Sequence, residues 1–112
     1  MTESAPHPDA PPALDSLVEA RRMVETKTAP RVTEEAIRSK IAAVEYLTHD
    51  TTTICFITMR NGWRSMGTST PASAENYDAE IGRRYAYDQA FRPLWQLEGY
   101  LLRETLHRGE TA

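Results

Sequence analysis

Apolar residues near the N-terminus adopt a helical spacing only after residue 13. Residues 1–13 contain four prolines and few large apolar side chains. This composition is typical of a disordered tail, because such a segment buries too little surface to offset its ordering entropy. The next segment repeats apolar residues at nearly helical intervals, and these are Leu14, Leu17, Val18 and Val24. The pattern predicts a short amphipathic helix and linker over residues 14–30.

A second helical stripe begins the segment that we interpret as the compact domain, residues 31–112. Thr33 is a suitable N-cap, and two glutamates follow it, where they favour the positive end of a helix dipole. The apolar positions of the stripe are Ile37, Ile41 and Val44. Their spacing predicts a helix that begins after Thr33 and ends near Glu45.

Segments rich in β-branched and aromatic residues follow and predict three strands. They read EYLT, TTTICFITMR and WRSMGTS, and HD and NG separate them. Asn61-Gly62 suits a type I′ turn, in which both central residues need a positive φ. The register implied by that turn pairs Arg60 with Trp63, Thr58 with Ser65 and Phe56 with Gly67.

The two-residue period then divides the hairpin between two faces. One face would hold Ile54, Phe56, Thr58, Arg60, Trp63 and Ser65, and the other Cys55, Ile57, Met59, Arg64 and Met66. Both faces carry large apolar side chains. We therefore expect a helix to cover one of them and a second subunit to cover part of the other, which predicts a homo-oligomer.

The final segment, residues 76–106, predicts a long helix capped by Asn76 or Asp78. The stripe expected to face the sheet consists of Ile81, Ala86, Ala90, Leu94, Leu97 and Leu101. Gly82 indicates close packing of the helix on the sheet, in preference to a ligand that approaches the backbone there. Pro93 should kink the helix or split it in two. The predicted fold is thus α+β: a helix, a three-stranded antiparallel β-meander and a long C-terminal helix packed on the sheet.

Composition and charge exclude several classes of protein. The net charge of -3 and the pI near 5.6 argue against a generic nucleic-acid binder. Cys55 is the single cysteine, so an intrachain disulfide is impossible. The sequence has neither a secretory signal nor a run of eighteen apolar residues. We expect a cytoplasmic protein that does not interact with membranes.

Catalytic and metal-binding motifs are absent from the sequence, so we predict a protein that is not an enzyme and has no cofactor. The pattern suited to binding centres on Arg83, which has Tyr87 four residues later. Arg84 is expected to pair with Asp88 at the same spacing. A guanidinium beside an aromatic side chain, such as Phe56 or Trp63 of the hairpin, can hold a phosphate and stack a base.

Several motifs resemble a known family. The stretches TICFITMRNGW, NYDAEIG and WQLEGYLLRETL, with the short GTS stretch between them, resemble small tailed-phage proteins. Those proteins are labelled by gene product forty-nine of the Escherichia podovirus N-four and gene product sixty-six of the Shigella phage Sf-six. The resemblance covers about residues 32–106 and implies a phage accessory protein.

A meander followed by a long helix, with an arginine in its second turn, is also similar to the first type of Thoeris anti-defence protein. Those phage proteins oligomerise and sequester cyclic ADP-ribose signals made by bacterial TIR-domain enzymes. The similarity implies that Arg83 holds phosphate, that Phe56 packs against a base, and that Arg31 and Ser69 approach the ligand. Tyr87 stands where the similarity leads us to expect a second arginine.

Three functions follow as hypotheses. The first is sequestration of a nucleotide-type immune signal in the cytoplasm of the host cell, with Arg83, Tyr87, Phe56, Trp63, Arg31 and Ser69 as the ligand-binding residues. The second is inhibition of a host protein through an interaction surface. The third is a structural or regulatory role in the phage without a ligand.

Overall fold

The computed structural model describes residues 15–25 and 28–109. It divides into two compact units, residues 1–30 and 31–112. In the first unit, helix α1 spans Asp15–Glu25. Its apolar residues Leu17, Val18, Met23 and Val24 are all exposed. The predicted disordered tail, residues 1–13, lies outside the described residues.

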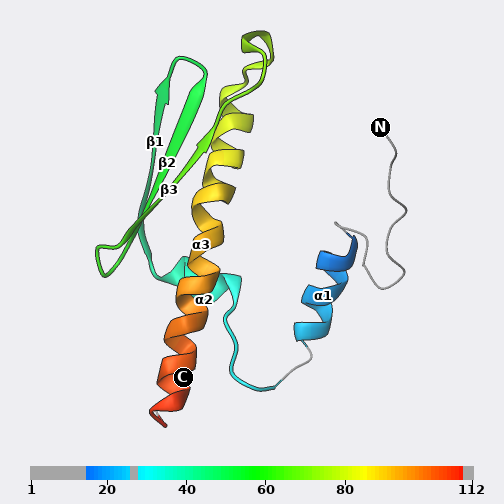
Figure 1. The fold of residues 1–112 in the computed structure, drawn as a ribbon, viewed down its shortest axis with the longest axis vertical. Helices are drawn as coiled ribbons and strands as arrows, with labels where there is room; N and C mark the ends of the chain where they lie inside the picture. The colour runs from blue at the N-terminus through cyan, green and yellow to red at the C-terminus, as the bar shows by residue number, and fades with distance from the viewer. Residues whose placement is uncertain (1–14, 26–27, 110–112) are drawn as a thin grey trace, which may run out of the picture. The chain divides into compact units, whose positions relative to one another are not determined.

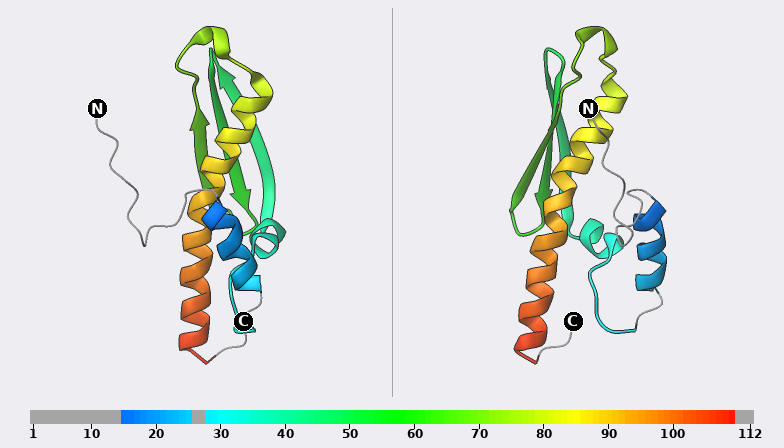
Figure 2. Two further views of the ribbon diagram at one scale, coloured as in Figure 1. Left: turned by 90° about the vertical axis from the view of Figure 1, so that its right-hand side faces the viewer. Right: turned by 45° about the vertical axis from the view of Figure 1, so that its right-hand side comes forward.

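The second unit is an α+β structure, as predicted (Figure 1). Its elements in chain order are α2 (Glu34–Ser39), β1 (Ile41–His49), β2 (Thr52–Met59), β3 (Arg64–Ser69), a 3-10 turn η1 (Ala74–Asn76) and α3 (Ala79–His107). The three strands form an antiparallel sheet in the order β1-β2-β3. Helix α3 packs mainly against β3 and β2, and its C-terminal half extends beyond the end of the sheet (Figures 1 and 2).

Helix α2 is much shorter than predicted. The Thr33 cap is confirmed, since its hydroxyl accepts a hydrogen bond from the Ala36 N–H at 3.0 Å. The predicted end near Glu45 is wrong, because the chain turns at Lys40 and enters β1 at Ile41. The apolar residues of that segment fit a strand as well as a helix, and pairing with β2 decides between the two.

The hairpin between β2 and β3 has a three-residue loop rather than the predicted two-residue turn. Met59 and Trp63 close it, with the Met59 N–H donating to the Trp63 carbonyl at 2.7 Å. Gly62 has a φ of 90°, whereas Asn61 is not in the positive-φ region that a type I′ turn requires. The Asn61 side chain instead accepts a hydrogen bond from the Trp63 N–H at 3.0 Å. This combination is typical of a turn followed by a left-handed glycine.

The extra loop residue shifts the predicted register by one. Phe56 is paired with Met66, and Ile57 with Ser65. The side chains of β3 therefore exchange faces relative to the prediction. The face toward α3 carries Thr53, Cys55, Ile57, Met59, Ser65 and Gly67, all of which are buried. The opposite face carries Phe56, Arg64 and Met66 together, whereas we expected Phe56 to share a face with Ser65.

Helix α3 begins at the predicted cap, where the Asp78 carboxylate accepts from the Ile81 N–H at 3.0 Å. The buried residues of the helix are Gly82, Ala86, Ala90, Phe91 and Leu94. The predicted stripe is therefore wrong at its two ends, since Ile81, Leu97 and Leu101 are exposed. Small residues four apart face the sheet and let the helix backbone approach it closely.

The predicted close packing at Gly82 is confirmed. A Cβ at this position would lie 2.6 Å from Thr53 Oγ1. A Cβ at Gly67, across the same interface, would collide with the backbone of α3 at Ala86 and Ala90. The Ser65 hydroxyl donates to the Ala90 carbonyl at 2.6 Å and joins β3 to the helix.

Pro93 does not split α3, which is continuous from Ala79 to His107. Proline removes one intrahelical hydrogen bond, to the carbonyl of Gln89. Pro93 and Gln89 are both exposed, so the lost hydrogen bond lies on the side of the helix away from the core. Among the helices of residues 15–25 and 28–109, none combines the length and apolar character needed to cross a lipid bilayer.

Candidate functional site

Arg83 lies exposed near the start of α3 and has no carboxylate partner among the described residues. Its neighbour Arg84 forms a salt bridge with Glu80 at 2.9 Å. The predicted pairing of Arg84 with Asp88 is wrong, since Asp88 binds Arg92 at 2.6 Å. In both observed pairs the acid precedes the arginine by four residues, which is the more favourable orientation in a helix.

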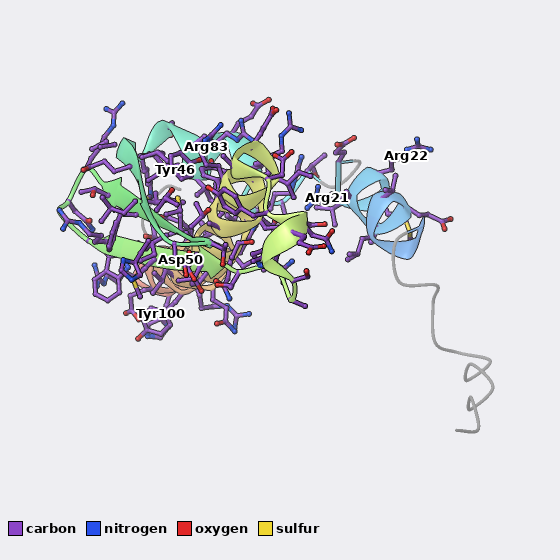
Figure 3. The ribbon with its side chains drawn as sticks, turned by 90° about the horizontal axis from the view of Figure 1, so that it is seen from above. Arg21, Arg22, Tyr46, Asp50, Arg83 and Tyr100 are labelled. Carbon is purple, nitrogen blue, oxygen red and sulfur yellow. The ribbon has the colours of Figure 1, made fainter. Side chains whose placement is uncertain are left out.

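The aromatic side chain that the structure places near Arg83 is that of Tyr46 in β1. Figure 3 labels both residues on the same side of the unit. Burial raises the pKa of the Tyr46 phenol, and its cross-strand partner Cys55 adds to the rise, whereas the positive charge of Arg83 lowers this pKa. The guanidinium is therefore close enough to act electrostatically on the phenol.

Tyr87 lies one turn after Arg83 and is half-buried against the core. Its ring centroid is 5.7 Å from that of Phe91. Burial raises the pKa of Tyr87, and the Arg38 guanidinium of α2 opposes this rise. Arg38 also forms an exposed salt bridge with Glu34 at 3.3 Å.

Together Arg83, Tyr87, Tyr46 and Arg38 form what we call the arginine–tyrosine cluster. It lies on the helix side of the sheet, where β1 extends past the region covered by α3: Val44 and Tyr46 of this strand remain partly exposed on that side. Two cations and two phenols can supply charge, hydrogen-bond donors and aromatic surface to an anionic ligand. A single copy offers this as an open surface rather than as an enclosed pocket.

The remaining predicted site residues lie elsewhere. Phe56 is on the opposite face of the sheet, with the Arg64 guanidinium 6.0 Å from its ring centroid. Trp63 is exposed at the hairpin end. Ser69 ends β3, half-buried and paired with Thr53, and Arg31 is exposed ahead of α2. Arg83 and Tyr87 thus lie one turn apart on α3, and neither Phe56 nor Trp63 lies beside them.

Sequence reasoning missed Tyr46 and Arg38. The stretch EYLT, which contains Tyr46, was predicted as a strand, but no register against TTTICFITMR was predicted for it, so Tyr46 was not placed on the face that carries Cys55. The useful signal was the pairing of Tyr46 with Cys55, which becomes visible only when β1 is aligned on β2.

A groove of about 550 Å³ lies between the hairpin end and the C-terminal half of α3. Its lining includes Met59, Trp63, Leu94, Leu97, Tyr100 and Leu101. The salt bridge between Lys40 and Glu98, at 2.6 Å, stands at its edge. This surface is mainly apolar and differs in character from the arginine–tyrosine cluster, so it suits an apolar partner better than a polyanion.

Neither metal binding nor a nucleophile is supported in the part of the chain that the structure describes. No group of three or more His, Cys, Asp and Glu side chains there could hold a metal ion. Cys55 is fully buried, and burial raises the pKa of its thiol, which is the reverse of what a nucleophilic cysteine requires.

Comparison with known proteins gave one finding. The model of the phage protein (N4 Gp49/phage Sf6 gene 66) family matches residues 32–106. This match confirms the resemblance inferred from the motifs of the hairpin and the last helix. No curated protein and no solved structure gave a significant match.

Proposed function

Because the chain belongs to the phage protein (N4 Gp49/phage Sf6 gene 66) family, we propose that it is an accessory anti-defence protein of a phage. In this proposal it binds and sequesters a nucleotide-type immune signal of the cyclic ADP-ribose kind in the host cytoplasm. It captures the signal without catalysis, so its effect depends on affinity and on the number of protein copies.

The observation that carries this proposal is the environment of Arg83. Four other arginines of the second unit, Arg38, Arg84, Arg92 and Arg108, are held by carboxylates four residues away. Arg83 has no such partner among the described residues, its charge acts on the phenol of Tyr46, and Tyr87 follows it by one helical turn. An uncommitted guanidinium can give two parallel hydrogen bonds to a phosphate.

The tyrosines supply the second part of the recognition. Tyr46 and Tyr87 offer an aromatic face for a base or ribose and hydroxyls for its polar edges. They take the role that the sequence argument gave to Phe56 and Trp63. Because the surface is open in one copy, a tightly bound ligand would need further contacts from a second copy or from a rearranged side chain.

The test is titration calorimetry of the full chain with cyclic ADP-ribose isomers and cyclic dinucleotides. A charge-assisted hydrogen bond contributes about 1.5–3 kcal/mol. Arg83→Ala should therefore weaken binding by roughly ten- to a hundredfold. Arg84→Ala is the matched control, since it removes the same charge from the adjacent residue, and its affinity should stay near that of the parent protein.

Tyr87→Ala should also weaken binding, whereas Trp63→Ala should not. Absence of heat with every nucleotide would refute the proposal. Equal losses in the Arg83 and Arg84 variants would refute the specific role of Arg83, because they would show a general effect of positive charge.

A second candidate function, inhibition of a host protein, is favoured by the groove at the hairpin end. Trp63 and Tyr100 are exposed there beside Leu97 and Leu101. Exposed aromatic residues grouped around an apolar groove are typical anchors for a protein partner. Under this alternative Trp63→Ala abolishes the effect of the protein in infected cells while Arg83→Ala leaves it intact, which is the opposite of the result expected for sequestration.

A further inference from the structure

One face of the sheet remains uncovered in the second unit. Helix α3 packs on the other face, and no further element of residues 31–109 packs on this one. The uncovered face, called here the outer face, carries a continuous apolar stripe across all three strands. The stripe consists of Leu47, Ile54, Phe56 and Met66, which the strand register places side by side.

Ile54 and Phe56 of this stripe are half-buried, whereas its other two side chains are too exposed to be explained as the edge of a core. Leu47 is 58% and Met66 59% exposed. Contiguous apolar surface of this kind, rimmed by polar residues, marks an interaction site. Since antiparallel strands with one solvated face normally alternate apolar with polar residues, these four positions depart from the pattern of a free sheet face.

The outer face also has an asymmetric distribution of charge. Glu45 lies on β1 at one edge, paired with Phe56 of the central strand. Arg64 lies on β3 at the opposite edge, where its Nε donates to Thr58 Oγ1 at 3.2 Å and its guanidinium lies 6.0 Å from the Phe56 centroid. Within residues 15–25 and 28–109, no salt bridge is formed by Glu45 or by Arg64.

We propose that a second copy of this chain covers the outer face, related by a two-fold axis that lies between the two sheets and parallel to their strands. Such an axis places β1 of one copy over β3 of the other and β2 over β2. Glu45 of each copy then lies over the region of Arg64 in the other copy, so the two-fold symmetry gives two such contacts. The apolar stripes are buried between the sheets.

The charges select this arrangement over its main alternative. An axis perpendicular to the strands would place β1 over β1 and β3 over β3. Glu45 would then face Glu45, and Arg64 would face Arg64. In the proposed arrangement Glu45 lies in the row of Phe56 and Met66, and Arg64 lies in the adjacent row on the same face. Neighbouring rows are about 7 Å apart along the strands and facing sheets about 10 Å apart, a separation that the long glutamate and arginine side chains can together span.

A second copy fits this face better than an unrelated partner, because the face carries both Glu45 and Arg64, which can pair with Arg64 and Glu45 of an identical face. Three strands spaced about 4.8 Å apart make a narrow face, so the interface is small. We therefore expect a dissociation constant on the order of micromolar. The inference does not depend on the proposed nucleotide ligand, since Arg83 and the outer face lie on opposite sides of the sheet.

The test is a charge exchange in the full chain, followed by sedimentation equilibrium over roughly 1–100 µM protein. Glu45→Arg and Arg64→Glu should each weaken the dimer at least tenfold, because each puts two like-charge contacts into a symmetric interface. The double variant, with both changes, should recover most of the affinity of the parent protein. Glu75→Arg is the matched control: it makes the same charge change at an exposed residue of η1 and should leave the dimer intact.

Circular dichroism of every variant confirms that the fold is retained. A monomeric parent protein at the highest concentration would overturn the proposal, and so would single variants that dimerise as tightly as the parent. Failure of the double variant to recover would overturn the proposed axis. Slow amide exchange and a buried Met66 in a monomer would show that another part of the same chain covers the face, which also contradicts the proposal.

Discussion

Replacing Gly67 by alanine should destabilise the protein more than any other substitution that adds one methyl group to the second unit. Gly67 faces α3 from the middle of β3 and is buried. A Cβ at this position would lie below 3.0 Å, a separation that real Cβ atoms avoid, from both the Ala86 carbonyl oxygen and the Ala90 amide nitrogen. Both are backbone atoms of a continuous helix, so no side-chain rotation can relieve the collision.

The helix must therefore move away from the sheet as a body. This movement loosens the contacts of Ala86, Ala90 and Leu94 with the strands and lengthens the 2.6 Å hydrogen bond from Ser65 to Ala90. Overpacking of a core typically costs 1–3 kcal/mol, and rigid surroundings place this case at the upper end. We expect a loss of about 3 kcal/mol, which for a unit of this size corresponds to a fall in Tm of roughly 12–24 °C.

The matched control is Gly99→Ala in the same helix. A Cβ at Gly99 meets nothing within 4 Å, so only the helical preference of alanine changes. That preference should raise stability by about 1 kcal/mol. Urea unfolding followed by tryptophan fluorescence, at one fixed protein concentration because association shifts apparent stability, measures both variants. A Gly67→Ala protein within about 0.5 kcal/mol of the parent would refute the close approach of α3 to β3.

Three further predictions follow from the buried Thr53 and Cys55 and from the partly exposed Tyr46. Thr53→Val should raise the free energy of unfolding by about 1 kcal/mol in the same urea assay, because the Thr53 hydroxyl is buried without a hydrogen-bond partner among the described residues; a loss would reveal a partner. The Cys55 thiol should react with iodoacetamide far more slowly in the native protein than in urea, since it is buried and its pKa is raised; equal rates would contradict its burial. Burial also raises the pKa of Tyr46 above 10.0, so the stabilisation that its neutral phenol contributes is complete below that pH and is lost as the pH rises through the higher folded pKa. Tyr46→Phe should therefore reduce the loss of stability at alkaline pH, and an unchanged pH profile of unfolding would contradict this.

The sequence alone determined the features that depend on a few neighbouring residues. The caps at Thr33 and Asp78 are both observed, because a capping hydrogen bond spans only three residues. The strict alternation of β2 and the length of the last helix also follow from local patterns, and they were enough to establish the α+β class. The family resemblance depended on the same contiguous motifs, and it covers residues 32–106.

Tertiary structure alone decided the features that depend on how separate segments meet. Ile41 and Val44 suit either a helix or a strand, and only the neighbouring β2 makes them a strand. One extra residue in the loop before Trp63 reversed the faces of β3, because side chains alternate along a strand and a shift of one exchanges every position. Phe56 lies away from Arg83 because α3 covers the other face of β2, which carries Cys55 and Ile57. Tyr46 is on that covered face because it pairs with Cys55, and residues on different strands share a face only when the register allows it.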